Sequence, residues 1–206
     1  NPEKINFYSI KNSNKICDLN ISNFNSKNCK YTTLKRSILI DFLKMNLEDS
    51  LRTNHSISRI DHQNQKIQLF FENNKTFECD YLIISDGVFS KSKKLIFNNQ
   101  TKPKYNNTLA IRGTIPYASN IDSKNISLFF GPNFHLVIYP LSSKGDFNLI
   151  AIMKYNLSEE EQKNYSLFNN ENFIKKILGD VPLESKEFFD DIKELKIFPV
   201  FVSDNF

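Results

Sequence analysis

One segment near the middle of the chain restricts the fold more than any other. Residues 81–84, Tyr-Leu-Ile-Ile, form a continuous apolar run of strand length, and Ser85-Asp86-Gly87 follows directly. A run without polar alternation is typical of a strand buried on both faces, as in a parallel sheet covered by helices. Asp-Gly is a turn signal. The sequence therefore predicts a buried strand, a sharp turn, and then a short polar helix from about Ser90 to Phe97.

The turn after this strand has the chemistry of a ligand site. Ligands of α/β sheets lie beyond the carboxyl ends of the strands. Gly87 lets the backbone turn tightly or approach a ligand, Asp86 can accept hydrogen bonds from a ribose hydroxyl, and Ser90 can cap the next helix. The same residues also fit an ordinary strand–turn–helix closed by an Asx turn, so both interpretations stay open at this point.

The rest of the chain mixes helical and strand patterns. Apolar residues recur at helical spacing from Lys35 to about Leu51, and acidic residues begin a second helical region that covers about 158–195. Strands are predicted at 5–10, 15–21, 31–34, 56–61, 66–72, near Phe77, and at 109–117, 127–130, 134–141 and 147–155, with a strand-like run at 198–202. The four strands between 109 and 155 are typical of an antiparallel meander. The fold class is therefore α/β, with α+β elements interleaved.

Composition excludes several classes of protein. The chain has 206 residues, of which 40% are hydrophobic and 13% aromatic, with a net charge of +4, which argues against disorder. Lysines are scattered between acids, so a nucleic-acid partner is not expected. Cys17, Cys29 and Cys79 match no metal spacing and indicate reduced thiols in a cytoplasmic protein. No apolar run approaches the roughly 20 residues of a transmembrane helix.

The central segment resembles the Asp-Gly motif of the class A flavin-dependent aromatic hydroxylases, a family related to para-hydroxybenzoate and salicylate hydroxylases and to hydroxylases of ubiquinone biosynthesis. That motif is an acid, a hydrophobic strand, Asp-Gly, Ser, and a basic residue. In this chain these positions are Asp80, Asp86-Gly87, Ser90 and Lys93. Two positions differ: Ile84 stands where the family has a small residue, and Lys93 replaces Arg.

Three further segments resemble the same family in the same order. Lys35-Arg36-Ser37 resembles the start of its Arg-containing helix, and Leu109–Pro116 resembles its Arg-Gly strand. Gly131–Leu141 resembles its Gly-Pro…His…Tyr-Pro strand. The resemblance implies that Arg36 contacts the FAD together with Asp86, Gly87 and Ser90. It also implies that Arg112 holds a substrate carboxylate and that Tyr139 binds a phenol, with His135 on the same strand face. A tyrosine in the core and a structural histidine remain the alternatives for Tyr139 and His135.

The resemblance also implies a domain organisation and an activity. Residues 1–30 supply strands of a substrate domain, 31–100 are part of a Rossmann-like FAD-binding domain, and 101–206 form a substrate-binding mixed sheet with helices, incomplete at its end. The family's Gly-rich βαβ unit and later Gly-Asp motif are absent, so we expect a central fragment that is inactive alone.

The implied activity is an FAD-dependent monooxygenase that uses NAD(P)H and O2 to hydroxylate a small aromatic substrate. That substrate is a salicylate-like acid or a polyprenylated phenol; the second would bring peripheral membrane contact. No metal is required, and the sequence identifies no catalytic residue. The alternatives are a halogenase or prenyl reductase on the same scaffold, or a non-catalytic domain that uses its sheet to bind a partner.

Overall fold

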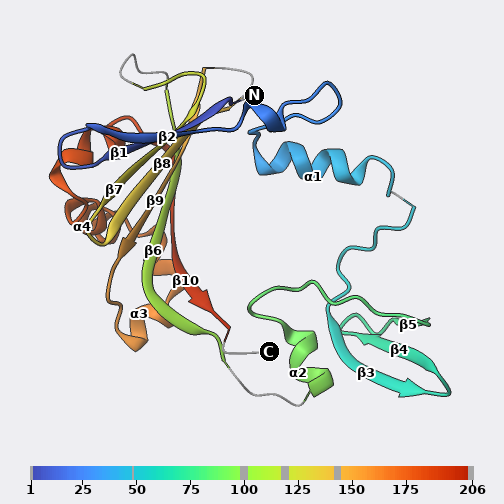
Figure 1. Ribbon diagram of the computed structural model, residues 1–206. Coiled ribbons are helices and arrows are strands. Elements are labelled where there is room, and N and C mark those ends of the chain that lie inside the picture. Colours follow the sequence, from blue (N-terminus) through green and yellow to red (C-terminus); the bar gives the residue numbers. More distant parts are fainter. Residues whose placement is uncertain (1, 48, 98–101, 117–120, 142–144, 204–206) are drawn as a thin grey trace. The chain divides into compact units, whose positions relative to one another are not determined.

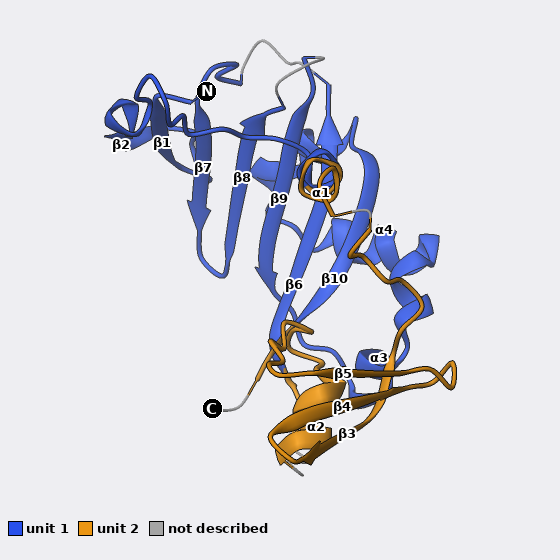
Figure 2. Ribbon diagram, turned by 90° about the vertical axis from the view of Figure 1, so that its right-hand side faces the viewer, with its two compact units in different colours: residues 1–39, 105–200 blue, residues 40–104, 201–206 orange. Residues whose placement is uncertain are grey.

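The computed structural model describes residues 2–47, 49–97, 102–116, 121–141 and 145–203. The chain divides into two compact units. Unit 1 contains residues 1–39 and 105–200, and unit 2 contains residues 40–104 and 201–206 (Figure 2). The division falls within helix α1 (Arg36–Lys44).

Unit 1 is built on a seven-stranded sheet (Figure 1). In spatial order its strands are β10 (Lys193–Val202), β6 (Lys104–Ile115), β9 (Phe147–Lys154), β8 (Phe134–Pro140), β7 (Ile126–Gly131), β1 (Lys4–Ser9) and β2 (Lys15–Asn20). Neighbours from β6 to β7 are antiparallel, as are β1 and β2, whereas β1 and β7 are parallel. The predicted meander is therefore present in β7, β8 and β9, whereas β6 pairs with β9 instead of β7, and the first two strands of the chain extend the sheet beyond β7.

The core lies on one face of this sheet. Buried and half-buried residues alternate along β8 and β9, as a pleated strand with one covered face requires. Leu109, Leu136 and Leu149 are fully buried and join Phe173 and Ile177 of helix α4 (Glu171–Gly179) in one hydrophobic cluster. The opposite face, which we call the open face, carries the half-buried or exposed residues of each strand.

The helices of unit 1 begin at polar caps. Helix α3 (Glu159–Lys163) starts with a capping box in which Ser158 and Glu161 bond each other's backbone N–H, and Asn170 caps α4. Two 3-10 helices, Tyr165–Asn169 and Leu183–Phe189, complete the region. The helical prediction for about 158–195 is wrong at its end, because the strand β10 already begins at Lys193 and lies next to β6.

Unit 2 contains a separate antiparallel sheet of β3 (Ile57–Gln63), β4 (Lys66–Phe71) and β5 (Thr76–Cys79). Asn64 and Gln65 join the first two strands with φ of 50° and 61°, the conformation of a tight hairpin turn. Helix α2 (Lys91–Phe97) follows, as the sequence predicts. A mixed sheet, a separate antiparallel sheet and interspersed helices confirm the α/β class with interleaved α+β elements.

Three further predictions of elements are wrong. Residues 81–84 pair with no strand in the described part of the chain, and Tyr81 and Ile83 are each 90% exposed. An apolar run shows that a segment can be buried, but burial on both faces needs covering elements, which the described residues of unit 2 do not supply. Residues 31–34 form no strand, and α1 ends at Lys44 rather than near Leu51. No helix in the described ranges is long and apolar enough to cross a membrane.

Candidate functional site

The Asp-Gly segment of unit 2 forms a loop that closes on the start of α2. The Ser90 N–H donates to the Gly87 carbonyl at 3.0 Å, and the Ser92 N–H donates to Asp86 Oδ2 at 3.0 Å. The Ser90 Oγ accepts the Lys93 N–H at 2.9 Å. The loop therefore satisfies two orphan N–H groups of the helix start. This is the structural role that the Asx-turn interpretation predicts.

The same loop also borders a cavity of about 510 Å³, which we call the Asp-Gly cavity. Its lining residues are Ile84, Asp86, Gly87, Val88, Ser90, Lys93, Phe97 and Ser203. Gly87 has φ +79°, and a Cβ added there would meet no atom within 4 Å. The backbone at Gly87 is therefore open to a ligand, and its conformation favours glycine.

Asp86 keeps its negative charge at neutral pH. A hydrogen bond from the Ser90 hydroxyl holds the pKa of this carboxyl below its ordinary value, and the Ser92 N–H adds to the effect. The Asp86 carboxyl oxygens therefore already accept hydrogen bonds from the Ser90 and Ser92 side chains and from backbone N–H groups. Asp86 and the open backbone at Gly87 thus both border the Asp-Gly cavity.

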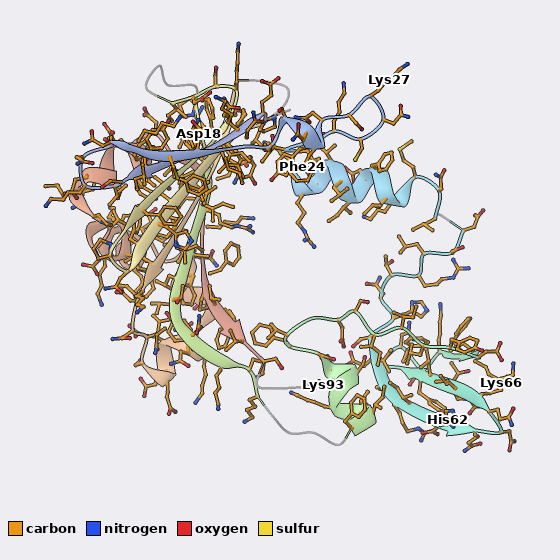
Figure 3. The ribbon with its side chains drawn as sticks, in the orientation of Figure 1. Asp18, Phe24, Lys27, His62, Lys66 and Lys93 are labelled. Atoms are coloured by element: carbon orange, nitrogen blue, oxygen red, sulfur yellow. The ribbon has the colours of Figure 1, made fainter. Side chains whose placement is uncertain are left out.

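The other basic and acidic residues of the motif occupy separate places. Asp80 forms an ion pair with Lys66 of β4 at the surface, and Lys93 lies on α2 beside the cavity (Figure 3). Arg36 is the first residue of α1, and its side chain is exposed.

The three residues for which the resemblance implies a substrate role all lie on the open face of unit 1. Arg112 on β6 and Tyr139 on β8 both project from this face. Burial raises the pKa of the Tyr139 hydroxyl, against the opposing effect of the nearby Arg112 charge. Tyr139 is thus a neutral donor at physiological pH, close to a cation. His135 is on the same face, with its ring centroid 6.2 Å from that of Phe130.

A cavity of about 550 Å³ borders Arg112, and we call it the Arg112 cavity. It is lined by Arg112, Gly113, Thr114, Asn148, Glu194, Lys196 and Phe198. The segment before α1 crosses the open face at this end of the sheet (Figure 2): the Thr33 hydroxyl donates to the Pro140 carbonyl at 2.7 Å, and Lys35 Nζ lies 4.0 Å from Glu194.

Sequence reasoning missed Asn148, which lies between Thr114 and Tyr139 on the open face. Its Nδ2 is buried and has no hydrogen-bond partner. Buried polar atoms are nearly always paired, so an orphan amide beside a cavity is a candidate ligand contact. The signal was present: Asn148 interrupts an otherwise apolar strand, Phe147 to Met153.

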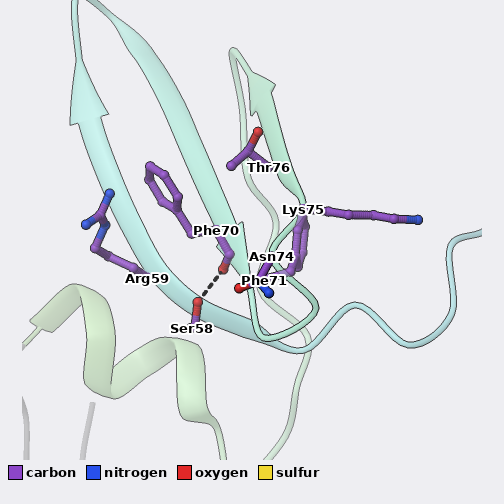
Figure 4. Close-up of a pocket in the computed structure, with 7 residues that line it drawn as sticks. All are labelled: Ser58, Arg59, Phe70, Phe71, Asn74, Lys75 and Thr76. Carbon is purple, nitrogen blue, oxygen red and sulfur yellow. Dashed lines mark hydrogen bonds between the residues drawn. The ribbon is translucent and has the colours of Figure 1, made fainter.

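A third hollow, of about 300 Å³, lies on the sheet of unit 2 between β3 and the β4–β5 turn (Figure 4). The Arg59 guanidinium lies 3.8 Å from the ring centroid of Phe70 and pairs with Asp61 at 3.1 Å, and the Ser58 hydroxyl donates to the Phe70 carbonyl. The polar groups of Arg59 and Ser58 are therefore already bound to other residues of the sheet. In the described ranges, no three His, Cys, Asp or Glu residues are grouped as metal ligands.

Several solved structures have a fold similar to that of this chain. The FAD complex of HpxO from Klebsiella pneumoniae with uric acid has a TM-score of 0.81 at 11% identity, covering 100% of this chain and 53% of that chain. The 2,6-dihydroxypyridine-3-hydroxylase from Arthrobacter nicotinovorans gives 0.70 at 11% identity, over 99% and 56%. A salicylate hydroxylase substrate complex gives 0.68 at 13% identity, over 98% and 53%. The fold is that of FAD-dependent monooxygenases.

Sequence similarity points to the same group. The chain is 24% identical over 130 residues to the FAD-dependent monooxygenase pigN of Monascus ruber, covering 58% of this chain and 30% of that protein. It is 25% identical over 118 residues to 3-hydroxybenzoate 6-hydroxylase 2 of Aquipseudomonas alcaligenes, over 53% and 34%. With salicylate hydroxylase of Pseudomonas putida the identity is 22% over 138 residues, covering 59% and 32%. No family model matches the chain.

These findings confirm the resemblance to FAD-dependent aromatic hydroxylases, at low identity over a little more than half of the chain. The chain spans about half the length of the similar structures, and the aligned part is about a third of each sequence relative.

Proposed function

We propose that the protein containing this chain is an FAD-dependent monooxygenase that hydroxylates a small aromatic substrate with NAD(P)H and O2. One observation carries the proposal: the Asp86-Gly87 loop, at the motif positions of the aromatic hydroxylases, borders a cavity with a charged carboxylate and an unobstructed backbone. The scaffold around it matches FAD-dependent monooxygenases over its whole length. We further propose that 31–100 contribute to the flavin domain, and 1–30 and 101–206 to the substrate domain.

In this proposal each named side chain binds or orients. Asp86 accepts hydroxyls of the bound dinucleotide, Gly87 lets its backbone approach, and Ser90 holds the loop against α2. Arg36 supplies a positive charge for the pyrophosphate. When bound, FAD supplies the redox and oxygen chemistry, which side chains alone cannot provide.

The substrate side follows from the charges of the open face. Arg112 attracts a carboxylate or phenolate, and Tyr139, held neutral by burial, donates a hydrogen bond to an oxygen of the same ring. His135 flanks the ring position. We propose a cytoplasmic location, because all three cysteines are unpaired and reduced thiols are typical of that compartment. No nucleic-acid partner is proposed. Membrane contact would follow only if the substrate were a prenylated phenol.

Asp86→Asn tests the cofactor side of this proposal. Asn keeps an acceptor for the Ser92 N–H but removes the charge, so we expect the full-length protein to fold normally and to bind FAD at least about tenfold more weakly, as loss of a charged hydrogen bond of about 1.5–3 kcal/mol implies. Bound flavin after gel filtration and the FAD dissociation constant are the measurements.

Asp18→Asn is the matched control, since Asp18 is a surface carboxylate of unit 1 paired with Lys15 (Figure 3). It should leave flavin content unchanged. Wild-type flavin affinity in the Asp86 variant would remove the Asp-Gly loop from the cofactor site.

A further inference from the structure

One line of side chains crosses the open face of unit 1, one residue per strand. Strand register places Arg112 opposite Ile150, Ile150 opposite Val137, Val137 opposite Leu128, and Leu128 opposite Phe7. The line therefore begins with a guanidinium and continues through four apolar side chains. We call the four residues Ile150, Val137, Leu128 and Phe7 the apolar row.

The apolar row is accessible. Each of its four side chains is only half-buried, whereas the core residues beside Val137 and Ile150 in β8 and β9 are fully covered. Phe130, whose ring stacks on Phe7 with centroids 6.0 Å apart, is 43% exposed. Neighbouring strands are about 4.8 Å apart, so the row continues for roughly 14 Å beyond Ile150. A partly exposed apolar strip of this length is a candidate binding surface.

The end of the line at Arg112 is polar and carries excess positive charge. The Arg112 cavity contains the cations Arg112 and Lys196 and one acid, Glu194, which already lies 4.0 Å from Lys35. The orphan amide of Asn148 and the neutral hydroxyl of Tyr139 add hydrogen-bond donors beside Arg112. The segment at Thr33 closes this end of the face by its bond to Pro140.

We propose that the open face binds a substrate with two parts: an anionic aromatic head in the Arg112 cavity and an apolar substituent that lies along the apolar row. The inference rests on the proposed function and narrows it, since neither a bare aromatic acid nor a neutral prenylated phenol satisfies both parts. A bare acid leaves the row uncovered. A neutral phenol leaves the Arg112 and Lys196 charges without an anion.

Three probe ligands separate these possibilities on the purified full-length protein: benzoate, para-pentylbenzoate and para-pentylbenzyl alcohol. Titration calorimetry gives each dissociation constant without any turnover. We expect para-pentylbenzoate to bind roughly tenfold or more tightly than benzoate, because several methylenes leave water. We also expect it to bind about tenfold more tightly than the neutral alcohol, because the alcohol loses the charge-assisted bond. Equal affinity for benzoate and para-pentylbenzoate would overturn the inference.

A double variant, Val137→Thr with Ile150→Thr, tests whether the pentyl group binds along the apolar row. Thr keeps the strand preference of a β-branched residue, so benzoate affinity should stay within about threefold while most of the pentyl gain is lost. Ile67→Thr, a half-buried residue of β4 in unit 2, is the matched control and should keep the gain. A full pentyl gain in the double variant would place the apolar group elsewhere and contradict the proposal.

Flavin content, measured on the same preparation, keeps the two proposals distinguishable. Protein that holds flavin and binds benzoate but shows no pentyl gain contradicts only the two-part substrate. Protein without flavin that shows the gain, and loses it in the double variant, supports the open face as the binding site and counts against the monooxygenase function.

Discussion

Gly113 lies next to Arg112, at a point where β6 passes close to the chain that enters β10. A Cβ added to Gly113 would lie 2.6 Å from Ile192 Cδ1 and 2.8 Å from the Lys193 carbonyl oxygen. The first neighbour is a side chain that can turn, but the second is backbone and cannot move without shifting β10. Because Gly113 has no side chain, β10, the edge strand with Glu194 and Lys196, can pack closely against β6.

Gly113→Ala should destabilise the protein by about 1–3 kcal/mol, as overpacking of a filled site does. Urea unfolding monitored by circular dichroism measures this loss. Gly179→Ala is the control, because a Cβ at the last residue of α4 meets nothing within 4 Å and alanine favours the helix. Equal stability of the Gly113 variant and the wild type would show that β10 approaches β6 less closely than in this structure.

Asp86 stabilises the start of a helix and also lies beside a cavity. The acid caps the start of α2 through the Ser92 N–H and still lines the Asp-Gly cavity. The sequence predicted this residue and two possible roles for it; the hydrogen bond from the Ser92 N–H is the structural role, and the ligand role stays a prediction. The sequence did not identify Asn148, because its importance depends on strand register, which places it between Thr114 and Tyr139.

Single elements were predicted where local chemistry decides them. Ser158 to Glu161 predicted the start of α3 correctly. The apolar residues of β8 and β9 predicted two strands. Residues 81–84 were predicted as a buried strand and are unpaired, because an apolar pattern reports what a segment can bury and not which neighbours cover it. The end of the last helical region was misplaced since β10 is fixed by pairing with β6, a contact distant in sequence.

The capping box of α3 gives a test at the scale of an element. Ser158→Ala removes the acceptor for the Glu161 N–H and should cost about 1 kcal/mol of unfolding free energy, within the usual range of about 0.5–2 kcal/mol for a lost N-cap. Urea unfolding gives the value. Glu160→Gln, in the same turn but outside the capping box, should have a smaller effect. If both substitutions changed stability equally, the box would not be what holds the start of α3.

At the scale of the whole molecule, the chain joins two units with different candidate roles. Unit 2 contains the Asp-Gly cavity, and unit 1 contains the open face with Arg112 and Tyr139. The order of the matching segments along the chain made the class of protein predictable from the sequence. The two-part substrate that we propose could not be predicted in the same way, because Arg112 and the apolar row come from five strands that only the fold brings into one line.

We propose that the full-length protein inserts one oxygen atom of O2 into an aromatic ring. In that reaction an aromatic C–H becomes C–OH, and the second oxygen atom leaves as water with electrons from NAD(P)H. The most direct measurement is mass spectrometry of the product formed by the full-length, flavin-loaded protein from an aromatic acid under oxygen-18 gas. We expect a hydroxylated product with one labelled oxygen. A product without the label, or NAD(P)H oxidation that yields only hydrogen peroxide with every aromatic acid tried, would contradict it.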